Sequence, residues 1–291
     1  MPSYNTAQRV LMLGVIISLL AMPATAIVAQ GPSQAGEIAV DSFGFEMVYV
    51  PAGMFEMGVS ESTVRGLVES LGFEYNSGFA QPEIFDTYTV NLNSFWIDKF
   101  EITVGQYMQF CNAESSLLCH SMEALDLDER FRDDPNKPIV GTTWQDAMIL
   151  CMSRIARLPT EEEWEYAASG PTNAIFPWGN APVHDNITAS FTGGTYAVGA
   201  RPGNVSWVGA FDMAGNAEEW VEDRYFPAYS ATVEIEGEGS GYYDYARAAR
   251  GGNYINPLPF VTTYTRSDYP PDVAIPEVGF RCARSSDPRT N

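Results

Sequence analysis

Residues 212–219 combine the side chains and backbone groups of a cation site. They read Asp-Met-Ala-Gly-Asn-Ala-Glu-Glu, so Asp212 and Glu219 flank small residues whose backbone carbonyls can turn inward. Carboxylate and carbonyl oxygens that converge on one point hold a hard cation, and calcium prefers such ligands. By itself the segment favours a solvated acidic turn without a metal. The alternative is a structural calcium site.

Nitrogen and sulfur ligands are scarce in the chain. Two histidines, His120 and His184, are too few for a site of three imidazoles. An even number of cysteines in an oxidising compartment favours disulfides, and four cysteines allow three pairings. The cysteines are Cys111, Cys119, Cys151 and Cys282.

Charge and composition limit the classes of partner. The chain has 291 residues, of which 45% are hydrophobic and 18% charged, as expected for a folded domain with a sizeable core. Its 16 Lys and Arg against 37 Asp and Glu give a net charge of -21, which repels nucleic acid. Metal cations and basic or neutral partners are compatible with this charge.

The N-terminal residues indicate export. Arg9 precedes the apolar residues 10–22, and small residues follow Pro23, which is typical of a secretory signal peptide. We interpret residues 1–26 as that peptide, with Ala29 as an alternative cleavage point, and expect a secreted or periplasmic protein. The other interpretation is an uncleaved membrane anchor with the domain outside, because residues 10–29 carry no charge and suffice to span a bilayer.

Four helices must position these groups. Residues 60–71 place apolar side chains at the spacing of one helical face. Three threonines can each begin a further helix, because a polar residue three positions later can return the capping hydrogen bond. These pairs are Thr103 with Gln106, Thr143 with Asp146, and Thr160 with Glu163. The last helix is expected to end at Gly170.

Strands are expected at 45–50 and 54–57, with one or two more within 86–102. Residues 173–284 are rich in Gly, Pro, Asn, Asp and aromatic residues and lack helical periodicity, which indicates loops and short strands.

These elements predict one domain over residues 43–284. A flexible linker is expected at 27–42 because the segment is small and polar, and a polar tail at 285–291.

Seven short segments follow one another along the domain. They are 50–53 (Val-Pro-Ala-Gly) with 57–58 (Met-Gly), 95–107, 157–167 (Arg-Leu-Pro-Thr-Glu-Glu-Glu-Trp-Glu-Tyr-Ala), 176–180 (Phe-Pro-Trp-Gly-Asn), 212–220, 250–253 (Arg-Gly-Gly-Asn) and 279–282 (Gly-Phe-Arg-Cys). In this order they resemble the formylglycine-generating enzyme, or sulfatase-modifying factor, family. The resemblance implies an α+β fold related to C-type lectins, loop-rich with little regular secondary structure.

The copper site of that family has no counterpart in this sequence. The resemblance implies oxidation of a sulfatase cysteine by oxygen and by copper held between two thiolates, which suit a soft ion. The matching positions here are Asn256 and Val261, and no cysteine lies between Cys151 and Cys282. Copper and the oxidase reaction are therefore not expected.

The resemblance also implies structural features. Calcium ligands would be Asp212 and Glu219 through side chains with Gly215 and Ala217 through carbonyls, and, for a weaker second ion, Asn186 and Ile187. One family disulfide would join Cys151 to Cys282, which leaves Cys111 for Cys119.

A binding groove is expected where the family enzymes have their active site. Its candidate residues are Glu218, Asn253, Tyr254, Asn256, Arg266 and Tyr269. Amide, guanidinium and phenol groups suit hydrogen bonds to a peptide, protein or glycan, although the same residues can simply complete the loop packing. We predict a non-oxidase binding or accessory module. The alternatives are an oxidoreductase with altered ligands or substrate, and a carbohydrate-binding or envelope-structural protein.

Overall fold

A computed structural model describes residues 34–76, 79, 85, 87–113, 133–190, 192–226 and 245–290. The expected signal peptide and Cys119 lie outside these residues. The chain divides into a unit of residues 1–31 and a second unit that starts at Pro32 and contains every described residue. Within the described residues, no helix is both long and apolar enough to cross a membrane.

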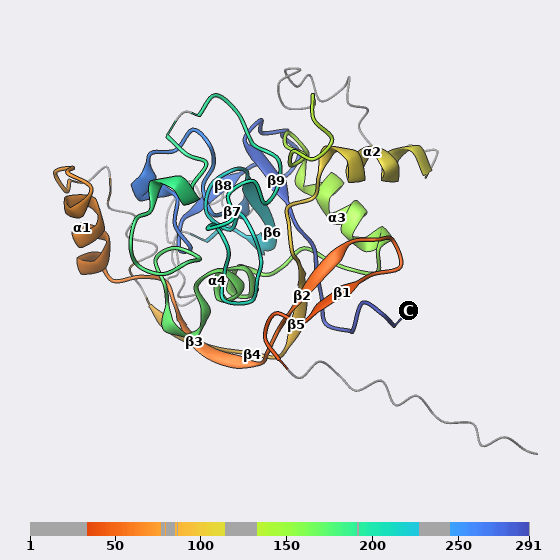
Figure 1. The fold of residues 1–291 in the computed structure, drawn as a ribbon, viewed down its shortest axis with the longest axis horizontal. Helices are drawn as coiled ribbons and strands as arrows, with labels where there is room; N and C mark the ends of the chain where they lie inside the picture. The colour runs from red at the N-terminus through yellow and green to blue at the C-terminus, as the bar shows by residue number, and fades with distance from the viewer. Residues whose placement is uncertain are drawn as a thin grey trace, which may run out of the picture. The chain divides into compact units, whose positions relative to one another are not determined.

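The described strands are short and form three sheets (Figure 1). One sheet has the order β1-β2-β5-β10, a second pairs β3 with β4, and the third has the order β8-β7-β6-β9, in which β9 runs parallel to β6. The strands are β1 (Ile38–Val40), β2 (Glu46–Val50), β3 (Gly53–Met57), β4 (Tyr88–Leu92), β5 (Phe95–Asp98), β6 (Glu218–Arg224), β7 (Arg247–Arg250), β8 (Arg266–Tyr269), β9 (Val278–Phe280) and β10 (Ala283–Arg284).

The four predicted helices are confirmed. They are α1 (Glu61–Ser70), α2 (Val104–Ala113), α3 (Trp144–Ser153) and α4 (Glu161–Ser169). Reciprocal capping hydrogen bonds start three of them at Thr103, Thr143 and Thr160, as their sequences predict. Gly170, with φ +68°, ends α4 in a conformation that favours glycine.

Helix α4 lies at the centre of the described fold. It contacts β3, β4, β6 and β7, so it connects two of the sheets (Figure 1). Trp164, Tyr166 and Ala167 are buried in one hydrophobic cluster with Phe55 of β3 and Val221 of β6. The helix therefore anchors β6, the strand that carries Glu218.

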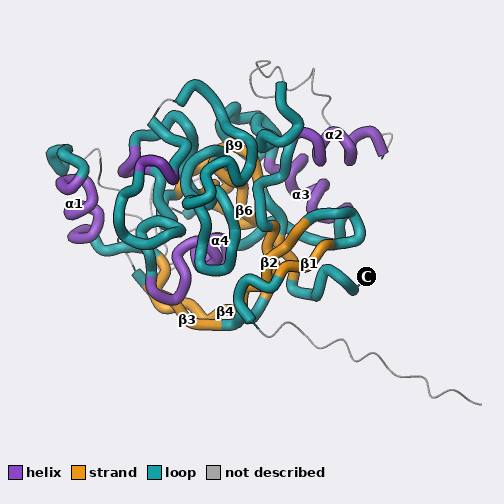
Figure 2. The backbone as a smooth tube through the Cα atoms, viewed as in Figure 1, coloured by secondary structure: helices purple, strands orange, loops and turns teal. Residues whose placement is uncertain are grey.

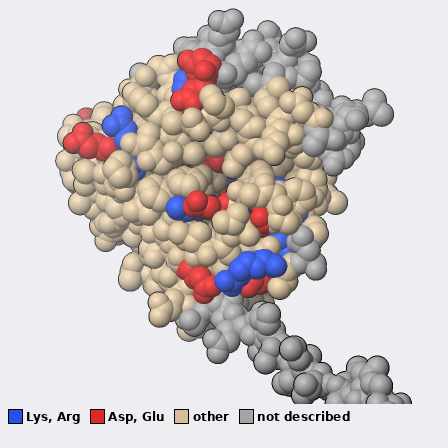
Figure 3. Space-filling model, turned by 45° about the vertical axis from the view of Figure 1, so that its right-hand side comes forward, with Lys and Arg blue, Asp and Glu red and all other residues tan. Residues whose placement is uncertain are grey.

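Most of the described chain is irregular, and loops surround the short strands (Figure 2). Between residues 173 and 284 the described part holds short strands and single turns of 3-10 helix, as predicted. On the face drawn in Figure 3, charged side chains form a few small groups that mix both signs, separated by uncharged surface. The expected α+β, loop-rich fold is confirmed.

The predicted linker over 27–42 is wrong in its described part. Residues Ile38 to Val40 pair antiparallel with β2. Ala39 is buried, whereas Ile38 and Val40 are each 50% exposed. Residues 38–40 are Ile-Ala-Val, an apolar run too short to stand out from the small and polar residues around it, so composition over 27–42 missed the strand. Asp41 is also buried, so the domain begins before residue 43.

The disulfide between Cys151 and Cys282 is present, with a Cα–Cα distance of 5.5 Å. It joins α3 to the chain between β9 and β10, and both cysteines are fully buried. The second expected bridge, Cys111–Cys119, includes a residue outside the described part of the chain.

Candidate functional site

Glu218 is the centre of the candidate site. It is the first residue of β6 and is buried. Its Oε2 accepts a hydrogen bond from the Tyr269 hydroxyl at 3.0 Å and lies 3.3 Å from Asn253 Nδ2. These residues meet because β7 lies between β6 and β8, and Asn253 follows β7 after two glycines. We call Glu218, Asn253, Asn256 and Tyr269 the Glu218 group.

A tight turn after β7 holds the two asparagines. The Asn253 backbone N–H donates to Asn256 Oδ1 at 2.8 Å, and the Ile255 N–H donates to Asn253 Oδ1 at 3.1 Å. Gly252 has φ +66°, and a Cβ at this position would lie 2.2 Å from the carbonyl oxygen of Phe260. Only glycine fits such a close backbone approach. The turn therefore fixes Asn253 against Glu218.

Burial dominates the electrostatics of the group. It raises the pKa of Glu218. Burial and then the Glu218 charge raise the pKa of Tyr269. Within the described part of the chain, Glu218 Oε1 is buried and makes no hydrogen bond of good geometry, although the Ser267 side chain is close enough to lower the pKa of Glu218. The group thus combines an unsatisfied acceptor with a phenol and two amides, which suits hydrogen bonding to a polar ligand.

Two other predicted groove residues, Tyr254 and Arg266, lie outside the Glu218 group. Tyr254 is buried beside Val140 and Ala217, and its backbone N–H donates to the Asn216 carbonyl. Arg266 does not join the Glu218 group. It lies three residues before Tyr269 in β8, and since side chains alternate along a strand, it points to the opposite face. There its Nε and Nη2 bind Glu161 at 3.0 and 2.6 Å.

The two positions matched to the copper thiolates do not fit copper. Val261 is fully buried in a hydrophobic cluster with Phe176, Leu258 and Ala214. Asn256 uses its side-chain oxygen to hold the turn described above. Neither side chain is a soft ligand.

Asp212 and Glu219 belong to a buried ionic cluster around Arg281. Both Glu219 oxygens accept hydrogen bonds from Arg281, at 2.6 and 2.7 Å, and Trp164 Nε1 adds a third at 2.8 Å. Glu101 is buried nearby and accepts hydrogen bonds from the Asn216 side chain and the Ala217 N–H. We call Glu101, Asp212, Glu219 and Arg281 the Arg281 cluster.

The Arg281 cluster carries more carboxylates than guanidinium groups. Burial raises the pKa of Asp212 to about 6, although the Gly199 N–H donates to its Oδ2 at 2.6 Å. Burial, followed by the charges of Asp212 and Glu219, raises the pKa of Glu101. An added cation would offset this excess of negative charge, and the carboxylates of the cluster offer it only oxygen ligands. However, among the residues that the structure describes, no three Asp, Glu, His or Cys side chains are grouped to hold a metal.

Adjacent residues of β6 therefore serve different sites. Glu218 and Glu219 point to opposite faces of the sheet because side chains alternate along a strand. Sequence reasoning missed Glu101 and Arg281, which are 180 residues apart and meet only through the fold.

The residues of the second expected calcium site are adjacent to this region. Asn186 ends a 3-10 turn (His184–Asn186), and its side chain packs against Gly203. Ile187 is buried in the cluster that contains Ala214 and Val261.

Asp223, at the far end of β6, predicts a pH effect on stability. Its Oδ2 accepts a hydrogen bond from the Glu161 N–H at 2.7 Å, yet burial and the Glu161 charge raise its pKa to about 7. An unfolded aspartate has a pKa of about 3.9. The folded protein thus holds this proton more tightly, and the resulting stability falls as pH rises from about 4 to 7.

We expect Asp223→Asn to raise the free energy of unfolding at pH 8 by about 1–3 kcal/mol and to change it little at pH 4. Urea unfolding at both pH values measures this difference. Asp287→Asn is the control of opposite sign, because the Arg289 hydrogen bond lowers the pKa of Asp287. Equal effects of Asp223→Asn at both pH values would contradict the assignment.

Comparisons with known proteins agree with this architecture. Residues 38–286 match the family model described as sulfatase-modifying factor enzyme 1-like domain. The formylglycine-generating enzyme of Bos taurus is 26% identical over 84% of this chain and 76% of its own. The inactive C-alpha-formylglycine-generating enzyme 2 of the same species is 29% identical over 81% and 87%. The structure of PvdO from Pseudomonas aeruginosa superposes with a TM-score of 0.67, at 23% identity, over 88% of this chain and all of that one.

Proposed function

Because this chain belongs to the family of sulfatase-modifying factor enzyme 1-like domains, we propose that it is a member without copper thiolates that binds a partner rather than oxidising a cysteine. The observation that carries the proposal is the chemistry at the two copper positions. Val261 lies in a hydrophobic cluster, and the Asn256 side chain is engaged in a turn. A relative whose name marks it as inactive gives secondary support.

Metal analysis and two substitutions test this proposal. Purified protein loaded with Cu(I) is expected to retain no tightly bound copper and to consume no oxygen with a cysteine peptide. The double variant Asn256→Cys with Val261→Cys is expected to bind about one copper per chain, since paired thiolates suit Cu(I), while each single variant binds none tightly. One equivalent of sulfur-bound copper in the unmodified protein would overturn the proposal. Failure of the double variant would instead contradict the matching of these positions.

We propose that the ligand, a peptide, protein or glycan, binds at the Glu218 group. The unsatisfied Glu218 oxygen, the Tyr269 hydroxyl and the asparagine amides support a polar ligand. Screening glycans and cysteine-containing peptides would find it. Tyr269→Phe is then expected to weaken binding by roughly five- to tenfold for one lost hydrogen bond. Tyr196→Phe, at a tyrosine that is 41% exposed, is the control and should leave affinity unchanged.

We also propose that calcium stabilises the fold at the Arg281 cluster, with Asp212 and Glu219 as side-chain ligands and Gly215 and Ala217 as carbonyl ligands. Each carboxylate oxygen has two lone pairs, so Glu219 can serve Arg281 and a cation together. Calcium at a hundred times its Kd is expected to add about 2.7 kcal/mol to the free energy of unfolding. Asp212→Asn should weaken this calcium dependence. Identical melting temperatures in calcium and in chelator would contradict it.

We place the protein outside the cytoplasm. The apolar N-terminal sequence and the buried disulfide support this location. Mass spectrometry of the exported protein is expected to find Ile27 or Gln30 at the N-terminus. An intact Met1 on a membrane-bound protein would favour the anchored alternative.

A further inference from the structure

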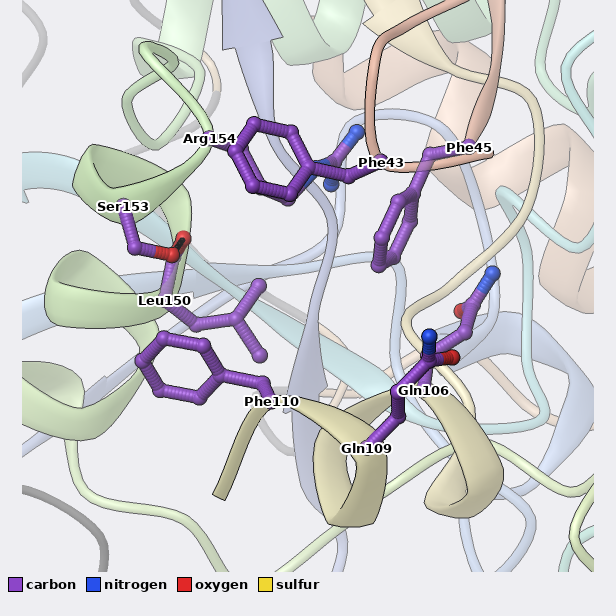
Figure 4. A pocket seen from close by; sticks show the side chains of 8 residues that line it. All are labelled: Phe43, Phe45, Gln106, Gln109, Phe110, Leu150, Ser153 and Arg154. Carbon is purple, nitrogen blue, oxygen red and sulfur yellow. Dashed lines mark hydrogen bonds between the residues drawn. The ribbon is translucent and has the colours of Figure 1, made fainter. Parts of the chain in front are cut away.

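A small pocket lies between the turn that precedes β2 and helices α2 and α3. Its volume is about 110 Å³, and none of its lining residues belongs to the Glu218 group or to the Arg281 cluster. Figure 4 shows the rings of Phe43, Phe45 and Phe110 and the side chain of Leu150 around a common space, with Gln106 and Gln109 on the α2 side. The walls are therefore mainly aromatic and aliphatic.

Asp41 holds the turn that carries Phe43 and Phe45. Asp41 Oδ1 accepts hydrogen bonds from the backbone N–H groups of both phenylalanines, each at 2.9 Å. Between them Gly44 has φ +90°, a conformation that favours glycine. Asp41 is in turn bound by Arg154 Nε and Nη2 at 3.0 and 2.9 Å. Phe43 is thus held in place although it is 50% exposed.

Arg154, the one charged residue among the described residues of the lining, offers no free charge to a ligand. Arg154 is buried and also donates two hydrogen bonds to Asp98, both at 2.8 Å. The Phe45 ring covers its guanidinium, with 3.6 Å from Cζ to the ring centroid. A charged ligand would have to compete with these carboxylates, so the pocket suits an uncharged one.

The polar side chains that line the pocket favour a ligand with a hydroxyl substituent. Gln106 Oε1 accepts the capping hydrogen bond from the Thr103 N–H, which directs its amide NH2 to act as a donor. Ser153 Oγ donates to the Leu150 carbonyl at 2.7 Å, and its lone pairs can accept. Gln106 lies on the opposite side of the space from Ser153 (Figure 4), so a ligand hydroxyl near Ser153 donates to Ser153 Oγ alone. The volume resembles that of an apolar cavity of about 150 Å³ that binds benzene, so the space fits one ring.

We propose that this pocket binds a single uncharged aromatic ring that carries a hydroxyl group, a ligand of the phenol class. The ring would be covered by Phe43, Phe45 and Phe110, and the hydroxyl would lie toward Ser153. Such a ring can come from a free small molecule or from a tyrosine of a peptide.

Ligand-observed NMR titration of the folded protein with p-cresol tests the proposal. We expect saturable binding, with toluene weaker by roughly five- to tenfold because it lacks the hydroxyl group. Phe43→Ala should weaken the binding of p-cresol by roughly tenfold. Phe226→Ala removes a phenylalanine of similar exposure, 51%, outside the pocket lining and is the matched control.

N-acetyl-tyrosinamide distinguishes the two sources. Binding that Phe43→Ala weakens shows that a peptide tyrosine fits, and binding of p-cresol alone assigns the site to a free phenol. The proposal is overturned if p-cresol shows no saturable binding, or if the Phe43→Ala and Phe226→Ala variants bind p-cresol with the same affinity. Because the pocket shares no residue with the Glu218 group, either result leaves the proposed function unchanged.

Discussion

Arg281→Leu is expected to lower the free energy of unfolding by about 3–5 kcal/mol, or to prevent folding. The substitution removes the cation that pairs with Glu219 and whose charge also offsets Glu101 and Asp212. Carboxylates that remain buried without a partner carry a large desolvation cost. Urea unfolding at pH 7 in the presence of calcium measures the loss.

Arg289→Leu is the matched control for this experiment. Arg289 also forms ion pairs, with Asp287 and Glu37, but its side chain is 43% exposed. Solvent-exposed pairs contribute about 0–1 kcal/mol. If both variants lost less than about 1 kcal/mol, the Arg281 cluster would not hold the fold together as described.

Removal of the Cys151–Cys282 disulfide has the second large expected effect. The double variant Cys151→Ala with Cys282→Ala should lose about 2–5 kcal/mol of stability. The bridge spans a sequence separation of 131, and in the chain-entropy model a loop of this length constrains the unfolded chain by about 4–5 kcal/mol. Both sulfurs also lie in a buried cluster with Leu150 and Phe280, so their loss leaves space in the core.

Thermal unfolding with and without reductant checks this prediction. The unmodified protein should lose stability when the bridge is reduced, whereas the double variant should melt at the same temperature in both conditions, apart from any contribution of the remaining cysteines. A double variant as stable as the unmodified protein would contradict the role assigned to the bridge.

The helices and the general fold could be predicted from the sequence because their signals are local. Thr143 with Asp146 and Thr160 with Glu163 are three residues apart, and both cap pairs form as expected. The loop-rich second half follows from its Gly, Pro and Asn content. The implied relation to C-type lectins stays a prediction.

The candidate site was only partly predictable because it depends on strand register. Asn253 and Tyr269 contact Glu218, but Arg266 points away, since a position three residues along a strand faces the other side. The pairing of Glu219 with Arg281 across 62 positions has no local pattern either.

The pairing of β5 with β10 bears on how the protein is made. β5 lies between β2 and β10 in its sheet. β5 is synthesised early, but the strand that pairs with its second edge, residues 283–284, is synthesised nearly last. Cys282 and Arg281 come just before that strand and complete the bridge and the ionic cluster. A chain still emerging from the ribosome therefore cannot close its core, and folding must wait until synthesis has passed residue 284.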